Sequence, residues 1–290
     1  MISTKEIKLN ILSIQNTRKI THAMELISAN KMNKIYHNLL HIIRPYSTSF
    51  TEVIENILSA HLEYQHPFLK KRNIKNIGFV VISTDRGLCG NLNFQIFKLL
   101  KKKIQIFKEK KINSYLLIIG EKAKEFFFSY EDSLFYKINF NNIPKIEDIQ
   151  NLVNTIFDYF NKEKVDEIYI LYNKFYNVMK HVPIYKRILP IQINQKKEIY
   201  KKEKSYWDYI YEGNPKLLLE FIFSKYIYSQ IYHSIIENLM CEHAARMLSM
   251  KNATENADEI INNLKLQYNK CRQFTITKEL AEIISGSESI

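Results

Sequence analysis

Long stretches without a helix breaker constrain this chain of 290 residues more than any other feature. The first 44 residues contain neither glycine nor proline, and neither do the 70 residues from Lys216 to Ser285. A compact domain turns its chain often, so such stretches are typical of long helices. At about 1.5 Å per residue, the second stretch would span on the order of 100 Å as a helix. That length exceeds the diameter of a domain of this size, so we expect the helix to project from it.

The apolar residues of the first stretch recur in steps of three and four, which indicates one face of a helix packed against another helix. They are Ile7, Ile11, Ile14, Ile20, Met24, Ile27, Ile35, Leu39 and Ile42, with Thr17 and Lys31 at the two missing positions. Pro45 removes one backbone hydrogen bond. Because helical spacing resumes at Phe50 and continues to Leu58, we expect a kink at Pro45 and not the end of the helix.

The last stretch follows a turn signal at residues 213–215 and ends at Gly286, a natural stop for a helix. It carries two apolar faces at helical spacing, the first marked by Ile227, Ile231 and Ile235 and the second by Ile261, Leu264, Tyr268 and Cys271. The sequence HAARMLSMKNATENADE between them is rich in alanine, serine, asparagine and acidic residues. Small side chains let two helices approach closely, while the polar remainder faces water or a polar partner.

The residues between the two stretches follow a different pattern, in which short apolar runs alternate with helical segments. We expect strands at 77–83, 115–119 and 166–172, one or two further strands within 175–193 around a proline, and helices at 92–106, 121–128 and 146–160. Strands that alternate with helices argue for a small, mostly parallel sheet with helices packed against it.

The net charge of +12 comes from 35 lysines and only 7 arginines. Residues 61–241 carry most of the excess, with 29 basic and 19 acidic side chains. Scattered lysine tufts without interleaved aromatic residues are typical of solvated surface. A basic face toward anionic lipid or an acidic partner stays open, as does the alternative of a basic coiled-coil scaffold or nucleic-acid-binding protein. Because lysine cannot replace the planar guanidinium fork, we expect the sparse arginines where geometry matters.

The three cysteines, at positions 89, 241 and 271, have no CxxC spacing and favour a reducing compartment over a disulfide framework or a zinc site. The N-terminal sequence MISTKEIKLN is too polar for a secretory signal. No apolar run approaches the roughly 20 residues that a membrane span needs. We therefore expect membrane association only through partners.

The segment STDRGLCGN at 83–91 follows a predicted strand and precedes a predicted helix, where α/β proteins bind phosphates. It matches neither the GxxxxGK[ST] loop nor the GxGxxG fingerprint. We therefore expect Gly87 and Gly90 to shape a tight turn that Asp85 caps. Cys89 has no histidine nearby in sequence to activate it, which favours a structural thiol.

No other group of residues in the sequence indicates a catalytic or metal-binding site. His37 and His41 are four residues apart, as in metal-binding pairs, but no HExxH pattern or nearby carboxylate accompanies them. No combination of nucleophile, base and orienting group stands out anywhere in the sequence. We predict no catalytic residue, no cofactor and no metal site.

Four segments resemble the signature blocks of the gamma subunits of bacterial F-type ATP synthases. They are KEIKLNILSIQNTRKITHAMELISANKMNKI at 5–35, STDRGLCGNLN at 83–93, SYWDYIYEGNPKLLLE at 205–220, and EHAARMLSMKNATENADEIINNLKLQYNKCRQFTITKELAEIISG at 242–286. The blocks are spread over the whole chain and follow the order of the family.

The resemblance implies an α/β fold class, with a long antiparallel coiled coil of the N- and C-terminal helices plus a small Rossmann-like α/β domain. The expected boundaries are 1–58 for the N-terminal shaft helix, 74–200 for the central domain and 208–290 for the C-terminal shaft helix. In this family the shaft stands inside a ring of three alpha and three beta subunits. The α/β domain sits with epsilon on the ring of c subunits.

The resemblance also implies a function. Proton flow through the membrane c ring turns the subunit, and the asymmetric shaft drives the beta sites through different nucleotide affinities. The subunit itself is expected to be non-catalytic, without a cofactor, a nucleic-acid partner or a small-molecule substrate of its own. Its expected location is peripheral, on the cytoplasmic face of the bacterial inner membrane.

Residue roles follow from the same resemblance. Six residues match shaft positions that meet the alpha–beta ring: Met24, Arg246, Arg272, Gln273, Thr277 and Glu279. Arginine and glutamine suit polar contacts that must form and break during rotation. The foot on the c ring and epsilon is expected to include Tyr211 and Glu212, where YEGNP stands in place of the EPDP-like run of many relatives.

Overall fold

The structure is a computed structural model that describes residues 4–59, 66–70, 72–130, 133–136, 144, 146–191 and 215–287. The chain divides into two compact units, one made of Met1–Asn30 with Arg246–Ile290 and the other of Lys31–Ala245. Helices α1 (Thr4–Asn38) and α7 (Pro215–Ser287) each contribute residues to both units. The predicted fold class, α/β with long helices at both ends, is confirmed.

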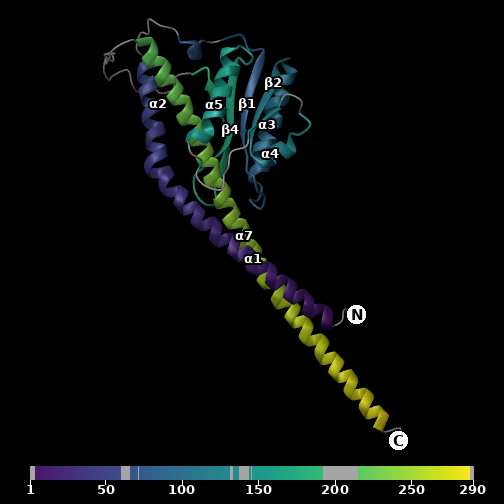
Figure 1. Cartoon of the computed structure of the whole chain (residues 1–290). Helices are drawn as coiled ribbons and strands as arrows, with labels where there is room; N and C mark the ends of the chain where they lie inside the picture. The colour runs from purple at the N-terminus through teal and green to yellow at the C-terminus, as the bar shows by residue number, and fades with distance from the viewer. Residues whose placement is uncertain are drawn as a thin grey trace. The chain divides into compact units, whose positions relative to one another are not determined.

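In the unit Met1–Asn30 with Arg246–Ile290, α1 and α7 lie side by side (Figure 1). Thr21 Oγ1 is 2.8 Å from Thr254 Oγ1, and Arg18 Nε is 2.6 Å from Asp258 Oδ1. The partner's number rises as the number on α1 falls, so the two helices run antiparallel. We call this pair of helices the rod.

The packing face of α7 in the rod repeats in alternating steps of four and three. Its members, all buried or partly buried, are Met250, Thr254, Ala257, Ile261, Leu264, Tyr268 and Cys271. A mean step of 3.5 residues is the signature of a left-handed coiled coil. The face predicted from Ile261 to Cys271 is therefore confirmed.

The predicted packing face of α1 is partly wrong. Ile20 and Ile27 are 61% and 57% exposed, whereas their neighbours Thr21 and Ser28 are 9% and 2% exposed. Counting in sevens from the buried Ile7 leads to positions 14, 21 and 28. The seven-residue repeat therefore places Thr21 and Ser28, and not the neighbouring isoleucines, in the seam. Ile42, farther along the predicted face, is also 61% exposed. Small polar side chains thus occupy part of the seam between the helices.

The unit Lys31–Ala245 contains a five-stranded sheet in the order β3-β2-β1-β4-β5. The strands are β1 (Asn76–Ile82), β2 (Asn113–Ile119), β3 (Ser133–Tyr136), β4 (Glu167–Phe175) and β5 (His181–Leu189). The first four are parallel, and β5 runs antiparallel to β4 at the edge of the sheet. Pro183 lies within β5, and an edge strand tolerates a proline because one side needs no ladder hydrogen bond. The sequence patterns missed β3.

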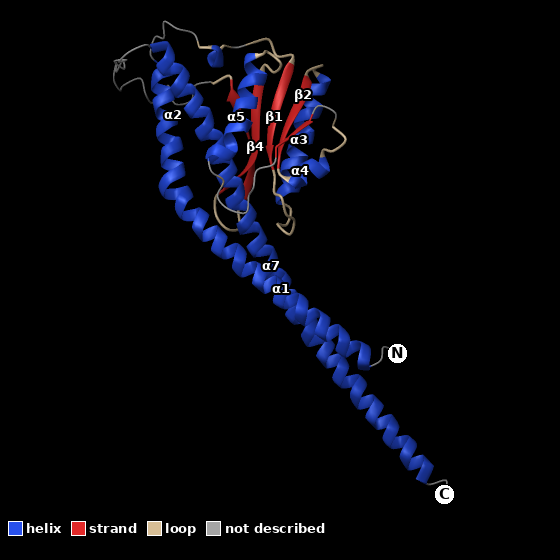
Figure 2. Ribbon diagram, in the orientation of Figure 1, coloured by secondary structure: helices blue, strands red, loops and turns tan. Residues whose placement is uncertain are grey.

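Helices cover both faces of this sheet (Figure 2). Helices α3 (Leu92–Glu109) and α4 (Glu121–Phe126) pack on one face with Phe79, Ile118 and Leu171. Helix α5 (Ile146–Asn161) and the N-terminal part of α7 pack on the other, in the larger core. Each face of the sheet therefore has its own apolar layer.

The first helical stretch continues through Pro45, as predicted, but changes its hydrogen-bonding pattern just before it. Residues Leu39–Ile43 form the π-helix η1, in which the Arg44 N–H donates to the Leu39 carbonyl. Helix α2 (Arg44–Ser59) follows directly, and a short 3₁₀ helix, η2, spans Pro67–Leu69. Prolines and π-turns both bend helices.

Candidate functional site: the exposed surface of the rod

The structure brings together four of the six residues predicted to contact a ring of other subunits. Arg272, Gln273, Thr277 and Glu279 are all exposed and lie within about two turns near the C-terminal end of α7. The Thr277 hydroxyl donates to the Gln273 carbonyl at 2.9 Å, which leaves the hydroxyl oxygen available as an acceptor. This end of the helix therefore presents a cation, an anion and neutral polar groups to its surroundings.

The other two residues lie elsewhere on the rod. Arg246 is 26 residues before Arg272 on the same helix, which corresponds to about 39 Å along the axis. Its side chain is only 7% exposed, so most of the guanidinium is covered within this chain. Met24 lies on α1 and is partly exposed. The predicted foot residues Tyr211 and Glu212 lie outside the described residues.

The end of α7 also exposes an unusual number of apolar side chains, which we call the apolar tip: Phe274, Ile276, Leu280, Ile283 and Ile284. Their exposed fractions range from 43% to 67%, and every residue from 272 to 284 is exposed. Figure 1 shows that α7 extends past the start of α1, so no other helix of the described residues runs alongside this segment. Contiguous exposed apolar surface marks an interaction site in soluble proteins.

A second apolar face lies on α1. Its members are Leu9, Leu12, Ile20, Leu26 and Ile27, each at least half exposed. Sequence analysis missed this face because Ile20 and Ile27 were assigned to the seam of the coiled coil and the three leucines were assigned to no face. The strict seven-residue spacing from Ile7 would have separated the two faces.

Two ion pairs on the rod are exposed and contribute little to stability. The Arg18–Asp258 pair links the two helices at 2.6 Å, but both side chains are nearly half exposed. Lys278 Nζ and Glu282 Oε1 are 3.6 Å apart on the tip, also in solvent. Exposed pairs of this kind contribute about 0–1 kcal/mol each, so they are easily exchanged for contacts with another protein.

The polar groups of the loop at 83–91 form hydrogen bonds within the loop and with the first residues of α3 and α4. Asp85 Oδ1 accepts a hydrogen bond from the Glu121 N–H at 3.2 Å, at the start of α4. The Thr84 hydroxyl donates to the Arg86 carbonyl at 2.8 Å and accepts from Asn93 Nδ2 at 2.7 Å. Asp85 was expected to cap the turn itself, but its carboxylate instead binds the start of α4, which the next strand of the sheet brings next to the loop. This arrangement is that of a structural turn.

The turn and its thiol agree with the structural interpretation. Gly90 has a φ of +60°, a conformation that favours glycine. Cys89 is 3% exposed and its sulfur accepts a hydrogen bond from Asn93 Nδ2 at 3.6 Å. The predicted structural role of Cys89 is consistent with this burial. A second thiol, Cys241, is fully buried, and burial raises its pKa well above the ordinary value.

The side chains of His37 and His41 lie next to each other on the first helical stretch. The rings of His37 and His41 are 4.7 Å apart, centroid to centroid, and tilted by 48°. Among the described residues, no three histidine, cysteine, aspartate or glutamate side chains are grouped so that they could hold a metal ion. Among the residues that the structure describes, no helix combines the length and apolarity needed to cross a membrane either.

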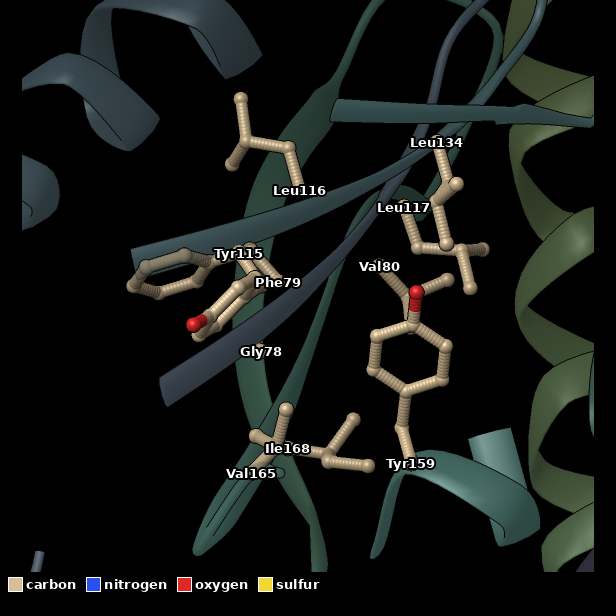
Figure 3. Close-up of a pocket in the computed structure, with 10 residues that line it drawn as sticks. All are labelled: Gly78, Phe79, Val80, Tyr115, Leu116, Leu117, Leu134, Tyr159, Val165 and Ile168. Atoms are coloured by element: carbon tan, nitrogen blue, oxygen red, sulfur yellow. The ribbon is translucent and has the colours of Figure 1, made fainter. Parts of the chain in front are cut away.

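A cavity of about 240 Å³ lies in the unit Lys31–Ala245, which we call the α/β unit (Figure 3). It is lined by Gly78, Phe79, Val80, Tyr115, Leu116, Leu117, Leu134, Tyr159, Val165 and Ile168. These residues come mainly from β1, β2, β3, β4 and α5, and none of them is charged. A lining without a charged side chain offers no cation to hold a phosphate, and the ionisable groups in it are the phenols of Tyr115 and Tyr159.

Comparison with known proteins places this geometry in a family. A family model described as ATP synthase matches residues 3–290. The ATP synthase gamma chain of Glaesserella parasuis is 42% identical over 291 residues, covering 100% of both chains. The ATP synthase gamma chain of Coxiella burnetii is 41% identical over 293 residues, again with 100% coverage of both.

Solved structures agree on the fold. The rotor of the Euglena gracilis mitochondrial ATP synthase matches with a TM-score of 0.65 at 14% identity, covering 94% of this chain and 98% of that one. The central stalk and c ring of the Tetrahymena thermophila mitochondrial enzyme gives a TM-score of 0.61 at 20% identity, covering 81% and 99%. The full-length relatives and the shared fold lead to one conclusion. The chain belongs to the ATP synthase gamma chain family.

Proposed function

We propose that this chain is the central rotor stalk of a proton-translocating F-type ATP synthase, which couples proton flow through a c ring to ATP synthesis or hydrolysis on three alpha and three beta subunits. The observation that carries the proposal is the end of α7, where an exposed apolar tip is interleaved with Arg272, Gln273, Thr277 and Glu279. A helix end with this composition fits a socket in another protein, because water alone gives its apolar side chains no favourable contact.

The mechanism is allosteric coupling by differential contact. An antiparallel two-helix rod has no rotational symmetry about its axis, so each orientation presents different side chains to each surrounding catalytic site. A contact that stabilises one conformation of a site more than another shifts its nucleotide affinity. Exposed polar pairs, whose net energies are about 0–1 kcal/mol, suit contacts that must break as the rod turns.

The proposal assigns separate tasks to the parts of the chain. The helices at 1–58 and 208–290 form the shaft, and the domain at 74–200 forms the base that meets epsilon and the c ring. Five exposed or partly exposed residues contact the alpha–beta ring: Met24, Arg272, Gln273, Thr277 and Glu279. Arg246 contacts it only through the small part of its side chain that is exposed. Tyr211 and Glu212 belong to the foot. The chain itself performs no bond chemistry and lies peripherally on the cytoplasmic face of the membrane.

Reconstitution tests the proposal. The purified chain, mixed with alpha and beta subunits of a bacterial enzyme, is expected to co-assemble and to confer ATPase turnover. The variant Leu280→Asp with Ile284→Asp charges two tip residues that are 54% and 57% exposed, so the free chain should fold normally and yet fail to support turnover. Phe128→Asp is the matched control, because Phe128 is 82% exposed and belongs to the unit Lys31–Ala245, which is not part of the rod.

Two results would reject the rotor-stalk proposal. The first is failure of the wild-type chain to assemble with any alpha–beta set. The second is unchanged turnover in the doubly charged tip variant. Binding of the free chain to nucleic acid with a steep dependence on salt would instead support the basic scaffold.

A further inference from the structure

Helix α7 carries a line of buried polar residues where it crosses the α/β unit. We call this line the polar stripe; its members are Gln230, Ser234, Glu237, Asn238 and Cys241, none more than 6% exposed. Their spacing of four, three, one and three residues places them on one face of the helix. Apolar residues such as Ile231, Ile235 and Leu239 are interspersed among them and equally buried. The polar residues therefore lie inside the core and not at its edge.

Glu237 forms the centre of the stripe. Its Oε1 accepts hydrogen bonds from Arg44 Nε at 2.9 Å and lies 2.8 Å from Arg44 Nη2, and its Oε2 accepts from the Phe175 N–H at 2.8 Å. Arg44 Nη2 also donates to the Phe175 carbonyl at 2.9 Å. These bonds form a closed triangle between α7, the first residue of α2 and the end of β4. Arg44 is also the residue that follows the π-helix η1.

Two neutral side chains of the stripe, Gln230 and Asn238, make further links of this kind. Gln230 Nε2 donates to Ser47 Oγ at 3.1 Å, and its Oε1 accepts from Lys186 Nζ at 2.6 Å, which links α7 to α2 and to β5. Asn238 Oδ1 accepts from the Asn173 N–H at 3.2 Å, which links α7 to β4. Each contact is directional, and together they hold the helix from two sides.

Directional contacts do something that the surrounding apolar contacts cannot. Burial of apolar surface is non-directional, so a smooth apolar helix can roll or slide in its groove with little loss of buried area. A hydrogen bond to a fixed carbonyl or carboxylate is lost after a displacement of about 1 Å. Buried ion pairs are often no more stabilising than apolar replacements, and their best-attested use is to fix register.

We propose that the polar stripe is the torque coupling of this protein: it locks α7 against rotation and sliding on the sheet when force passes between the α/β unit and the helix. The inference rests on the proposed rotor function, because only a loaded helix needs such a lock. Glu237, Arg44, Gln230 and Asn238 are positioning residues in this scheme, since they act through α7 and touch no substrate.

The test separates coupling from stability by replacing the central pair with apolar residues of similar size. The variant is Glu237→Leu with Arg44→Met, assembled with alpha and beta subunits and observed by single-molecule rotation with a bead on the α/β unit. The variant loses the hydrogen bonds to the Phe175 N–H and carbonyl, so its unfolding temperature should fall. We expect the free chain to stay folded at the assay temperature, ATP-driven rotation at low load, and a loss of stall torque.

The matched control is Glu167→Leu with Arg187→Met. This pair has the same chemistry, with Arg187 Nη1 and Glu167 Oε1 2.8 Å apart and both side chains mostly buried. It joins β5 to β4 inside the sheet and does not involve α7. Its removal should leave the stall torque at the wild-type value.

Three outcomes contradict the inference: full stall torque in the test variant, an equal loss in the control, or a loss that tracks unfolding of the free chain. If the double variant does not fold, Gln230→Met removes one end of the stripe with less disturbance, and unchanged stall torque in that variant overturns the inference. Failure of the wild-type chain to rotate would instead reject the proposed function, so the two failures are distinguishable.

Discussion

Gly120 provides a prediction that can be worked out atom by atom. It precedes α4 with φ of +99° and ψ of 142°, a conformation that is essentially restricted to glycine. A Cβ placed on Gly120 would lie 2.5 Å from Ser83 Oγ and 2.6 Å from the Ser83 carbonyl oxygen. The Ser83 hydroxyl cannot simply turn away, because it donates to the Ile119 carbonyl and accepts from the Ala123 N–H, each at 3.0 Å.

Two costs therefore add in the variant Gly120→Ala. The backbone conformation costs an alanine about 1–3 kcal/mol. Displacing the ends of β1 and β2 to relieve the contact with Ser83 costs about another 1–3 kcal/mol. We expect the free energy of unfolding of the α/β unit to fall by about 4 kcal/mol, which for a unit of this size lowers the melting temperature by about 8–16 °C.

Thermal unfolding of the free chain, followed by circular dichroism, measures this effect. The control is Gly87→Ala in the neighbouring turn, where an added Cβ would meet nothing within 4 Å. That variant should match wild type or gain about 0.5 kcal/mol from a less flexible unfolded chain. A melting temperature for Gly120→Ala within about 2 °C of wild type would refute the reasoning.

Three further predictions concern the rod and its attachment. Ser28→Leu should destabilise the rod by about 1–3 kcal/mol, because it overpacks a site that is 2% exposed. Ile27→Ser should lower the stability of the free chain by about 0.5 kcal/mol or less, because Ile27 is exposed. Urea unfolding followed by the helical circular-dichroism signal compares the two variants, and a larger loss for Ile27→Ser would contradict the assigned seam. Met24→Lys should preserve assembly with alpha and beta subunits but lower the protons transported per ATP hydrolysed; fully coupled transport would show the role of Met24 to be wrong. Burial alone would raise the pKa of Glu237, but hydrogen bonds from His233 and the Phe175 N–H and the charge of Arg44 lower it below its ordinary value. The unfolded chain then binds more protons between the two pKa values, so this contribution to stability is present above the unfolded pKa and is lost as the pH falls through the folded pKa. Glu237→Gln should flatten that part of the stability–pH curve in acid denaturation, and an unchanged curve would contradict the assignment.

The long helices and the parallel sheet were predictable because both leave periodic signals. The absence of glycine and proline indicated the helices, and apolar runs such as Val80–Ile82 and Leu116–Ile119 indicated buried strands. The four-residue strand β3 is too short to leave a pattern that stands apart from its surroundings. Local sequence was thus sufficient for every long element but not for the shortest strand.

The seam of the rod was harder to predict, for a physical reason. An apolar face that is buried in the chain's own coiled coil has the same period as one that faces another protein. Ile20 and Ile27 could therefore belong to either, and the small polar pair Thr21 and Ser28 gave no hydrophobic signal for the true seam. The partner of Arg44 could not be predicted either, because Glu237 lies 193 residues away in sequence. Only the scarcity of arginine hinted that geometry mattered there.

The pairing of Thr21 with Thr254 has a consequence for how the protein is made. The two residues are 233 positions apart, so the first helix is synthesised long before its partner. At about 5–20 residues per second, α1 waits about 12–47 s on the ribosome before the matching turn of α7 exists. During that time its future seam is open to other nascent chains. A seam that contains threonine and serine is less adhesive than one of isoleucine, so the rod's modest packing also protects the chain from misassociation before α7 exists.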